Sequence, residues 1–222
     1  MRGGVIMDER MLKLVKAYQE HILEYSKSEY NETEVRNDFV NPFFEILGWD
    51  VLNRQNLPQY LREVKHEASV VVDEDGENKK KKPDYAFNLG TETVFFLETK
   101  KPAVNIIQNK ESAFQLRRYG WNGNLKASVL SNFTDLIIYD CSVRPSEKDD
   151  VMQAMVAHYH YTEYVDKFDE ISLLLSRRSV VTGRFNQYFA KLTSSLRKEP
   201  FDQYFLEQIK NWRYKLSADI LK

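Results

Sequence analysis

The sequence lacks a second cysteine, an excess of charge of either sign and a long hydrophobic run. Cys141 is the single cysteine among 222 residues, so no disulfide can form within the chain. A signal-peptide pattern and an apolar stretch of the ~18 or more residues that a membrane helix needs are also absent. The sequence therefore predicts a cytoplasmic protein with no membrane association.

The balance of charge excludes one broad way of binding nucleic acid. The chain has 32 Lys and Arg against 33 Asp and Glu, a net charge of −1. Proteins that coat nucleic acid through bulk charge are usually strongly basic, so a nucleic-acid site here must be a local patch. The hydrophobic content of 42%, with 13 Tyr and 13 Phe, is enough for one domain of good size with a packed core.

The stretch from Lys79 to Lys101 has the pattern of a β-hairpin. Two apolar runs flank a turn that contains Gly90. Side chains two residues apart on a strand point to the same face, so Glu98 and Lys100 are expected to share a face and Thr99 to point the opposite way.

An acidic residue also precedes the first strand of this hairpin, because Asp84 follows Pro83. Carboxylates are hard oxygen ligands for Mg²⁺, which binds through one or two of them together with water and substrate phosphate. A bound metal lowers the pKa of its water, and an ammonium nearby orients that water and offsets charge at phosphorus. Asp84, Glu98 and Lys100 therefore suit metal-assisted phosphodiester hydrolysis. An ordinary hairpin with solvated charges is the alternative for these letters alone.

Two helices are predicted before the hairpin. Apolar residues recur at helical spacing over 8–27, and a second helix opens at Glu32 and ends at Gly48. Pro42 falls inside the second helix and is expected to kink or split it. Glu32 and Glu34 lie in its first turn, where acids also complement the helix dipole.

After the hairpin the sequence predicts a helix over 105–119 and two strands over 127–133 and 135–140. Roughly five or six strands interleaved with helices indicate an α/β fold, a mixed β-sheet flanked by helices on both sides. From Val151 onward only helices are predicted, ending in an amphipathic stripe. The stripe consists of Phe201, Phe205, Ile209, Trp212, Leu216 and Ile220.

The hairpin motif resembles that of the PD-(D/E)XK nuclease superfamily. Pro83-Asp84 matches the first half of the motif and Glu98-Thr99-Lys100 the second. Across Glu32 to Ile220, the order of further motifs is similar to the N-terminal part of type IIG restriction-modification enzymes, and similar domains open the motor subunits of type I enzymes. These motifs are Glu-x-x-Val-Arg, Gln-Leu-Arg-Arg-Tyr-Gly, Tyr-x-Tyr-x-Glu-Tyr and Asn-Trp-Arg.

The resemblance implies a restriction-endonuclease-like fold and a Mg²⁺-dependent DNA endonuclease of a bacterial restriction-modification system, with Mn²⁺ as a substitute metal. It divides the chain into a nuclease core with N-terminal helices over 1–145 and a helical extension over 146–222. The extension would lead to a methyltransferase and specificity domain in cis or in trans, because the chain has no Asn-Pro-Pro-Tyr-type motif. The implied substrate is double-stranded DNA, and cutting both strands needs a second copy or two events.

The resemblance also assigns roles to residues. Asp84, Glu98 and Glu32 are expected to hold Mg²⁺, with Lys100 orienting and helping to deprotonate the attacking water. Gln115, in a Gln-x-x-x-Tyr arrangement on a helix, is expected to steady that water. Contacts with DNA phosphate are expected from Arg36, Lys82, Arg117, Arg118 and Tyr119.

Several alternatives stay open at this point. Glu34 is the second choice for the helix carboxylate, and Arg36 would instead pair with a neighbouring acid. His158 and His160 do not face each other on a helix, so packing or surface roles are expected for them rather than metal binding. At the level of function, the alternatives are a catalytically idle DNA-binding or docking module with the nuclease fold, and a repair or recombination nuclease.

Overall fold

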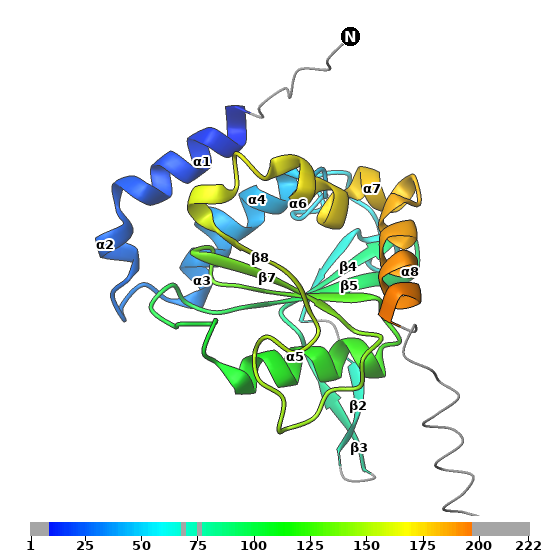
Figure 1. Cartoon of the computed structure of the whole chain (residues 1–222). Helices are drawn as coiled ribbons and strands as arrows, with labels where there is room; N and C mark the ends of the chain where they lie inside the picture. The colour runs from blue at the N-terminus through cyan, green and yellow to red at the C-terminus, as the bar shows by residue number, and fades with distance from the viewer. Residues whose placement is uncertain (1–8, 68–69, 75–76, 197–222) are drawn as a thin grey trace, which may run out of the picture. The chain divides into compact units, whose positions relative to one another are not determined.

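The protein is described by a computed structural model that covers residues 9–67, 70–74 and 77–196. Within these residues a mixed six-stranded sheet is covered by α4 and α6 on one face and by α5 on the other (Figure 1). The predicted α/β fold with flanking helices is confirmed. The amphipathic stripe predicted from Phe201 to Ile220 lies outside the described residues.

The sheet has the strand order β1-β4-β5-β6-β7-β8, and a separate two-stranded sheet is formed by β2 and β3. Neighbouring strands are antiparallel except β5 and β6, which are parallel. A parallel pair needs a crossover connection, and α5 supplies it. The strands are β1 Val64–His66, β2 Val70–Glu74, β3 Glu77–Lys81, β4 Tyr85–Leu89, β5 Glu92–Thr99, β6 Ala127–Ser131, β7 Asp135–Asp140 and β8 Met155–His160.

The last strand of the sheet corrects the prediction that only helices follow Val151. β8 pairs with β7, with His158 opposite Ile137 and His160 opposite Asp135. Its residues are mostly half-buried rather than alternating between buried and exposed. An edge strand of this kind lacks the period of two by which a strand is recognised in sequence.

The helices are α1 Glu9–Glu20, α2 Ile22–Tyr25, α3 Glu32–Val35, α4 Asn41–Ile46, α5 Lys110–Asn122, α6 Phe168–Leu175, α7 Arg177–Val181 and α8 Arg184–Leu196. Short turns are the π-helix η1 Arg36–Val40 and the 3₁₀ turns η2 Gln59–Leu61 and η3 Tyr161–Glu163. None of the described helices is long and apolar enough to cross a membrane.

The helix predicted over Glu32 to Gly48 is continuous in direction but changes its winding at η1. Asn41 donates its backbone N–H to the Arg36 carbonyl, five residues back, and Pro42 follows in the first turn of α4. Proline has no N–H to give and crowds the preceding turn, so a wider π-turn before it avoids the clash. The predicted split of the helix takes the form of a change of helix type, from α3 through η1 to α4.

Two clusters of side chains fix the elements that surround the end of β5. One joins α5 to the sheet and includes Phe96, Leu116 and Ile137. The other is aromatic and centres on Phe133, whose ring lies 4.9 Å from that of Phe39 on η1. Because Phe39 and Leu116 are both buried, η1 and α5 are held firmly on opposite sides of the sheet.

The contact between α5 and the sheet leaves no room for a side chain at Gly120. A Cβ atom there would overlap Cys141 Sγ and Ser128 Oγ, both buried. Gly120→Ala is therefore expected to lower the free energy of unfolding by about 1–3 kcal/mol, although alanine favours helices by ~1 kcal/mol over glycine. Chemical denaturation measures the loss.

Lys110→Ala, at an exposed position of the same helix, is the control and is expected to change stability by at most ~0.5 kcal/mol. Equal stability of Gly120→Ala and the parent would contradict the close approach of α5 to the sheet.

Candidate active site

The hairpin brings Asp84 and Glu98 to the same end of two paired strands. Tyr85 pairs with Leu97, so the next residue outward on each strand lies at this end. The backbone N–H of Asp84 donates to the Glu98 carboxylate, and the Asp84 carbonyl accepts from Glu67 N–H at 2.9 Å. The two acids of the motif are thus neighbours in space.

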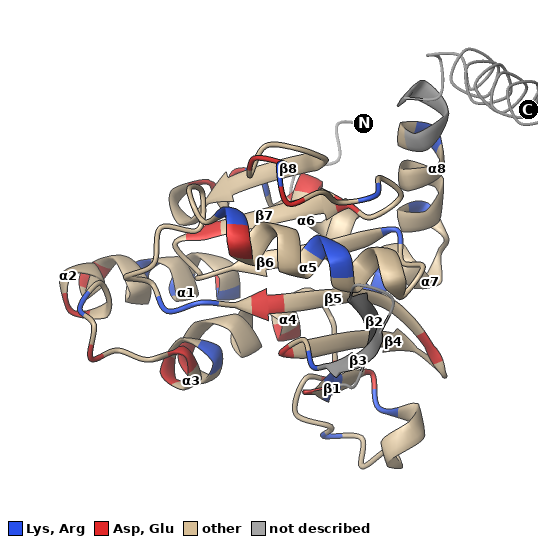
Figure 2. Cartoon of the chain, turned by 90° about the horizontal axis from the view of Figure 1, so that it is seen from below, with Lys and Arg blue, Asp and Glu red and all other residues tan. Residues whose placement is uncertain are grey.

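Lys100 lies immediately after β5 and points to the same side as Glu98, as the period of a strand predicts. Its Nζ atom lies 2.9 Å from Glu98 Oε1. Its backbone N–H donates to the Ser131 carbonyl at 2.9 Å, which fixes Lys100 to the end of β6. Acidic and basic segments lie together at the end of β5 (Figure 2).

Thr99 takes part in this site, although it was expected to face away from it. Its backbone N–H and its hydroxyl both donate to Asp84 Oδ2, at 2.8 and 2.5 Å. The strand period correctly separates Thr99 from Glu98. It gives no position for Asp84, which precedes β4 and lies within reach of Thr99.

Arg36 reaches the site from η1. Its Nη1 atom lies 3.1 Å from Asp84 Oδ1, and its Nε donates to the Glu32 carbonyl at 3.2 Å. In the sequence Arg36 was assigned to DNA phosphate, with pairing to an acid as the alternative. In the structure Arg36 pairs with an acid, as the alternative predicts, and that acid is Asp84 of the motif.

The two glutamates of α3 have different surroundings. Glu34 accepts from the Asn31 N–H at 2.7 Å while the Asn31 side chain caps Thr33 and Glu34, so Glu34 completes a capping box. Glu32 is half-buried, and its charge contributes to raising the pKa of Lys100. Of the two, Glu32 is the one in electrostatic contact with the site.

The pKa values of the motif residues reflect burial and mutual charge. Burial raises the pKa of Glu98, and the neighbouring Asp84 charge raises it further, while Lys100 opposes both effects. Burial alone would lower the pKa of Lys100, but Glu98 above all, with Glu32 and Asp84, raises it. In the metal-free protein Lys100 is therefore held as an ammonium, which can orient water and stabilise negative charge. Its part in deprotonating the water stays a prediction.

The donor set fits a divalent cation with few protein ligands. Within residues 9–67, 70–74 and 77–196 no three His, Cys, Asp or Glu side chains form a ready metal-binding group. Asp84 and Glu98 nevertheless place two carboxylates side by side, and Mg²⁺ commonly binds through one or two carboxylates with water and phosphate. The role of Glu32 as a third ligand stays a prediction.

The helix after the hairpin carries Gln115 and Tyr119 on one face. Gln115 Nε2 donates to the Tyr119 hydroxyl, as expected for residues four apart. Arg118 lies over the ring of Phe114, 5.2 Å from its centroid, and both line a cavity of about 490 Å³ with Gln115. The action of Gln115 on a water molecule stays a prediction.

All five residues expected at DNA phosphate have contacts within the protein, and Tyr119 is also buried, which corrects its assignment to phosphate. Arg117 is buried, with 1% of its side chain exposed, and pairs with Asp149 at 2.7 Å, so its assignment to phosphate is corrected. Arg117 shares the buried face of α5 with Ala113, Leu116 and Gly120, at spacings of three and four residues. Lys82 is exposed and its Nζ lies 3.8 Å from Glu67, a spacing that leaves its charge accessible.

The histidines that resemble a metal pair are on strand β8 rather than on a helix. His158 Nε2 lies 2.7 Å from Asp135 Oδ1, and His160 Nδ1 lies 2.9 Å from Thr162 Oγ1. Both imidazoles therefore have polar partners within the fold.

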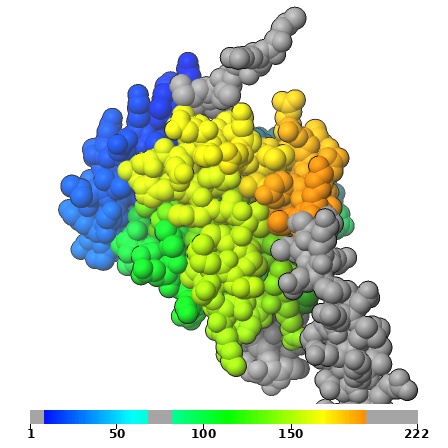
Figure 3. Space-filling view, viewed as in Figure 1, coloured from blue at the N-terminus to red at the C-terminus, as the bar shows by residue number. Residues whose placement is uncertain are grey.

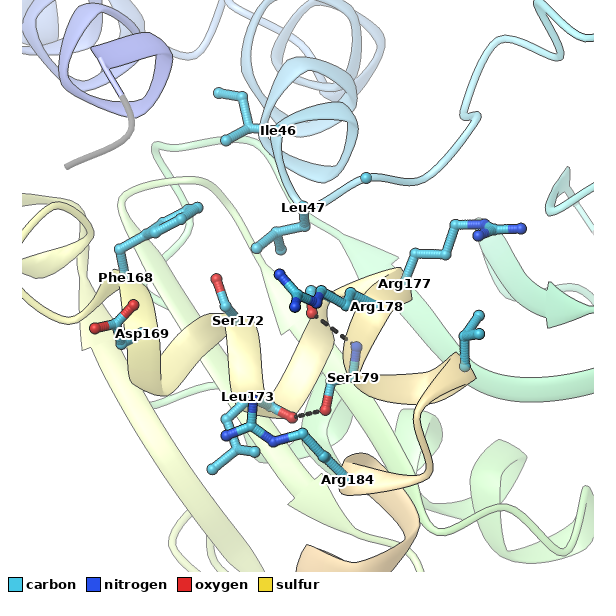
Figure 4. A pocket seen from close by; sticks show the side chains of 13 residues that line it. Ile46, Leu47, Phe168, Asp169, Ser172, Leu173, Arg177, Arg178, Ser179 and Arg184 are labelled. Atoms are coloured by element: carbon cyan, nitrogen blue, oxygen red, sulfur yellow. Dashed lines mark hydrogen bonds between the residues drawn. The ribbon is translucent and has the colours of Figure 1, made fainter. Parts of the chain in front are cut away.

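The N-terminal helices border the segment that follows β5. The helices over 9–25 lie beside that segment in Figure 3, and Lys101 Nζ donates to the Ser28 carbonyl at 3.5 Å. A cavity of about 890 Å³ lies elsewhere, where α6 and α7 meet the end of α4, and includes Arg178 and Arg184 (Figure 4). It contains no predicted site residue.

The fold has the mixed β-sheet with flanking helices that the resemblance implies. Among known proteins, the chain is similar to the type II restriction enzyme and methyltransferase RM.Eco57I of Escherichia coli, with 44% identity over 214 residues. The match covers 96% of this chain but 21% of that protein. The predicted resemblance to restriction-modification enzymes is confirmed. No family model and no solved structure matches the chain.

Proposed function

We propose that the chain is the DNA-cleaving module of a bacterial restriction-modification enzyme and hydrolyses phosphodiester bonds with a divalent metal. The observation that carries the proposal is the meeting of Asp84, Glu98 and Lys100 at the end of β5. The similarity to RM.Eco57I supports it, because the match extends over 96% of this chain at 44% identity.

The residues divide the work of an in-line attack by water, in which a new P–O bond forms as the bond from phosphorus to the leaving strand-end oxygen breaks. The water loses its proton to solvent, and solvent protonates the leaving oxygen. Asp84 and Glu98 would hold Mg²⁺, or Mn²⁺ in its place, and the metal would lower the pKa of a bound water and offset phosphate charge. Lys100 orients the attacking water and stabilises charge that develops at phosphorus. Glu32 and Gln115 act from the facing helices, Glu32 beside Lys100 and Gln115 on the water.

Sequence recognition lies outside this chain in our proposal, because phosphate contacts position a protein without specifying bases. The chain spans 21% of the length of RM.Eco57I, which is a methyltransferase as well as a restriction enzyme. We propose a methyltransferase and specificity domain, in cis or in trans, as the partner on double-stranded DNA in the cytoplasm. The nuclease core then extends from the predicted 1–145 through β8, and the connector follows it.

The test is conversion of supercoiled plasmid to the nicked form by the purified chain. Nicking is expected in Mg²⁺ and in Mn²⁺, with little sequence preference, and a chelator is expected to abolish it. DNA binding is expected to weaken steeply with salt, because phosphate contacts release counterions. Nicking that persists in chelator, or that neither metal supports, would contradict the proposal. Comparing linear, branched and single-stranded DNA separates a restriction role from a repair role.

One observation favours the idle-module alternative. Both oxygens of Asp84 have protein partners, Arg36 on Oδ1 and Thr99 on Oδ2. Titration with Mn²⁺ discriminates, because an idle module binds DNA without binding the metal, whereas an active site binds both.

A further inference from the structure

The Asp84 carboxylate is held by two kinds of partner. On Oδ2 the donors are the backbone N–H and the hydroxyl of Thr99, whose side chain is fully buried within β5. On Oδ1 the donor is the Arg36 guanidinium, at 3.1 Å. The Thr99 bonds belong to the sheet itself, whereas the Arg36 bond comes from a long side chain on a separate element.

Arg36 is placed so that it can leave Asp84 without disturbing the core. Its other side-chain contacts are the Glu32 carbonyl at 3.2 Å and the Thr33 hydroxyl at 3.5 Å, both on the exposed start of α3. The side chains of Arg36 and Asp84 are 23% and 19% exposed. The guanidinium can turn toward solvent, because Arg36 is held in the fold by the backbone of η1 and not by its side chain.

The two neighbouring acids explain why the metal-free site holds a cation on Asp84. Asp84 and Glu98 are adjacent acids, and each has one cation of its own, Arg36 for Asp84 and Lys100 for Glu98. Lys100 contacts Glu98 Oε1 at 2.9 Å, whereas Arg36 contacts Asp84 Oδ1, so Arg36 is the cation that a metal on Asp84 meets. A divalent ion that binds Asp84 competes for Oδ1 and repels the guanidinium.

We propose that Arg36 is a removable counter-ion of Asp84: it neutralises this carboxylate in the metal-free protein, is displaced when a divalent cation binds, and then contacts DNA phosphate. The inference rests on the proposed nuclease function and adds a regulatory link to the same site. A displaced guanidinium is a planar, permanently charged fork that suits a phosphate group.

Metal and DNA then bind with positive cooperativity. DNA phosphate gives the displaced Arg36 a new partner, which lowers the free energy needed to displace it. Because coupling between two ligands is reciprocal, DNA tightens metal binding by the same factor by which metal tightens DNA binding. The arginine thus favours a metal-free site until DNA is present.

The test compares Mn²⁺ affinity, measured by electron paramagnetic resonance and calorimetry, in four forms of the chain: wild type, Arg36→Gln, Arg36→Lys and Arg54→Gln. Without DNA, Arg36→Gln is expected to bind Mn²⁺ roughly 3- to 10-fold more tightly than wild type, because a competing charge of a half-exposed pair is gone. Arg36→Lys keeps the charge and is expected to stay near wild type. A short duplex is expected to tighten Mn²⁺ binding by wild type and much less by Arg36→Gln.

Arg54→Gln is the matched control. Arg54 pairs with Glu45 on α4 at 3.2 Å, an arginine–carboxylate pair at the other end of the same helical run. It is expected to leave Mn²⁺ affinity unchanged, and thermal unfolding of all variants checks that the fold is retained.

The outcomes separate the inference from the function on which it rests. Absence of Mn²⁺ binding by wild type and by every variant overturns the proposed function. Mn²⁺ binding by wild type that is equal or weaker in Arg36→Gln overturns the inference, because Arg36 then positions Asp84 for the metal instead of competing with it. Equal tightening in Arg36→Lys and Arg36→Gln overturns it as well, since charge is then not the cause.

Discussion

Lys100→Ala is expected to lower the rate of metal-dependent DNA cleavage by about 10³-fold, within the range of losing a positioned acid–base or charge-stabilising group. The Lys100 ammonium lies 2.9 Å from Glu98 and has 20% of its side chain exposed. Because the Lys100 side chain is not part of a packed cluster, the free energy of unfolding is expected to change little. Plasmid nicking and thermal unfolding measure the two effects.

Lys101→Ala is the matched control for this substitution. The neighbouring lysine donates to the Ser28 carbonyl rather than to an acid of the motif, so its loss is expected to leave cleavage near the parent rate. Equal losses in Lys100→Ala and Lys101→Ala would show that general charge matters rather than position. Retained cleavage in Lys100→Ala would show that its role is misassigned.

The pH profile of Lys100→Ala carries further information. The pKa of Glu98 is already raised by burial and by the Asp84 charge, and Lys100 is the main group that opposes the increase. Without Lys100 the Glu98 carboxyl takes up a proton at a higher pH than in the parent. A protonated carboxyl is a poor metal ligand. When the pH is lowered, the variant is therefore expected to lose metal binding at a higher pH than the parent does.

Asp84→Asn is expected to reduce Mn²⁺ affinity by more than the ~10–100-fold that follows loss of a ligand's hydrogen-bond partner, and to abolish cleavage. The amide keeps the size of the side chain and can still accept from Thr99, but it has no charge to hold a cation. Arg36 loses its partner while it is 23% exposed, so the loss of stability is expected to be at most ~1 kcal/mol. Calorimetric titration with Mn²⁺ measures the affinity.

Asp38→Asn is the control for Asp84→Asn. Asp38 lies on η1 and accepts from the Tyr30 hydroxyl at 2.9 Å, outside the motif. Its change is expected to leave Mn²⁺ binding intact. Unchanged Mn²⁺ affinity in Asp84→Asn would remove Asp84 from the metal site and with it the proposed mechanism.

The parts of the site that follow from local sequence were predicted. Glu98 and Lys100 share a face because side chains alternate along a strand, and the turn at Gly90 places Asp84 opposite them. The α/β fold follows from the same local patterns, because apolar runs and helical spacing report burial within single elements.

The parts that depend on distant partners were not predicted. Arg117 lies on the buried face of α5 with Ala113 and Gly120, and its charge partner there, Asp149, lies 32 residues later in the sequence. Arg36 and Asp84 are 48 residues apart, so their pairing depends on where η1 lies against the sheet. For β8, partial burial at the sheet edge removed the alternation that identifies a strand.

Gly120 of α5 packs closely against Cys141, so the reactivity of this thiol shows whether α5 is packed on the sheet. Cys141 is the single cysteine of the chain, it is buried, and burial raises its pKa to about 12. A thiol-modifying reagent can therefore reach it as a reactive thiolate only when α5 separates from the sheet. The labelling rate therefore measures how often α5, the helix that carries Gln115, separates from the sheet.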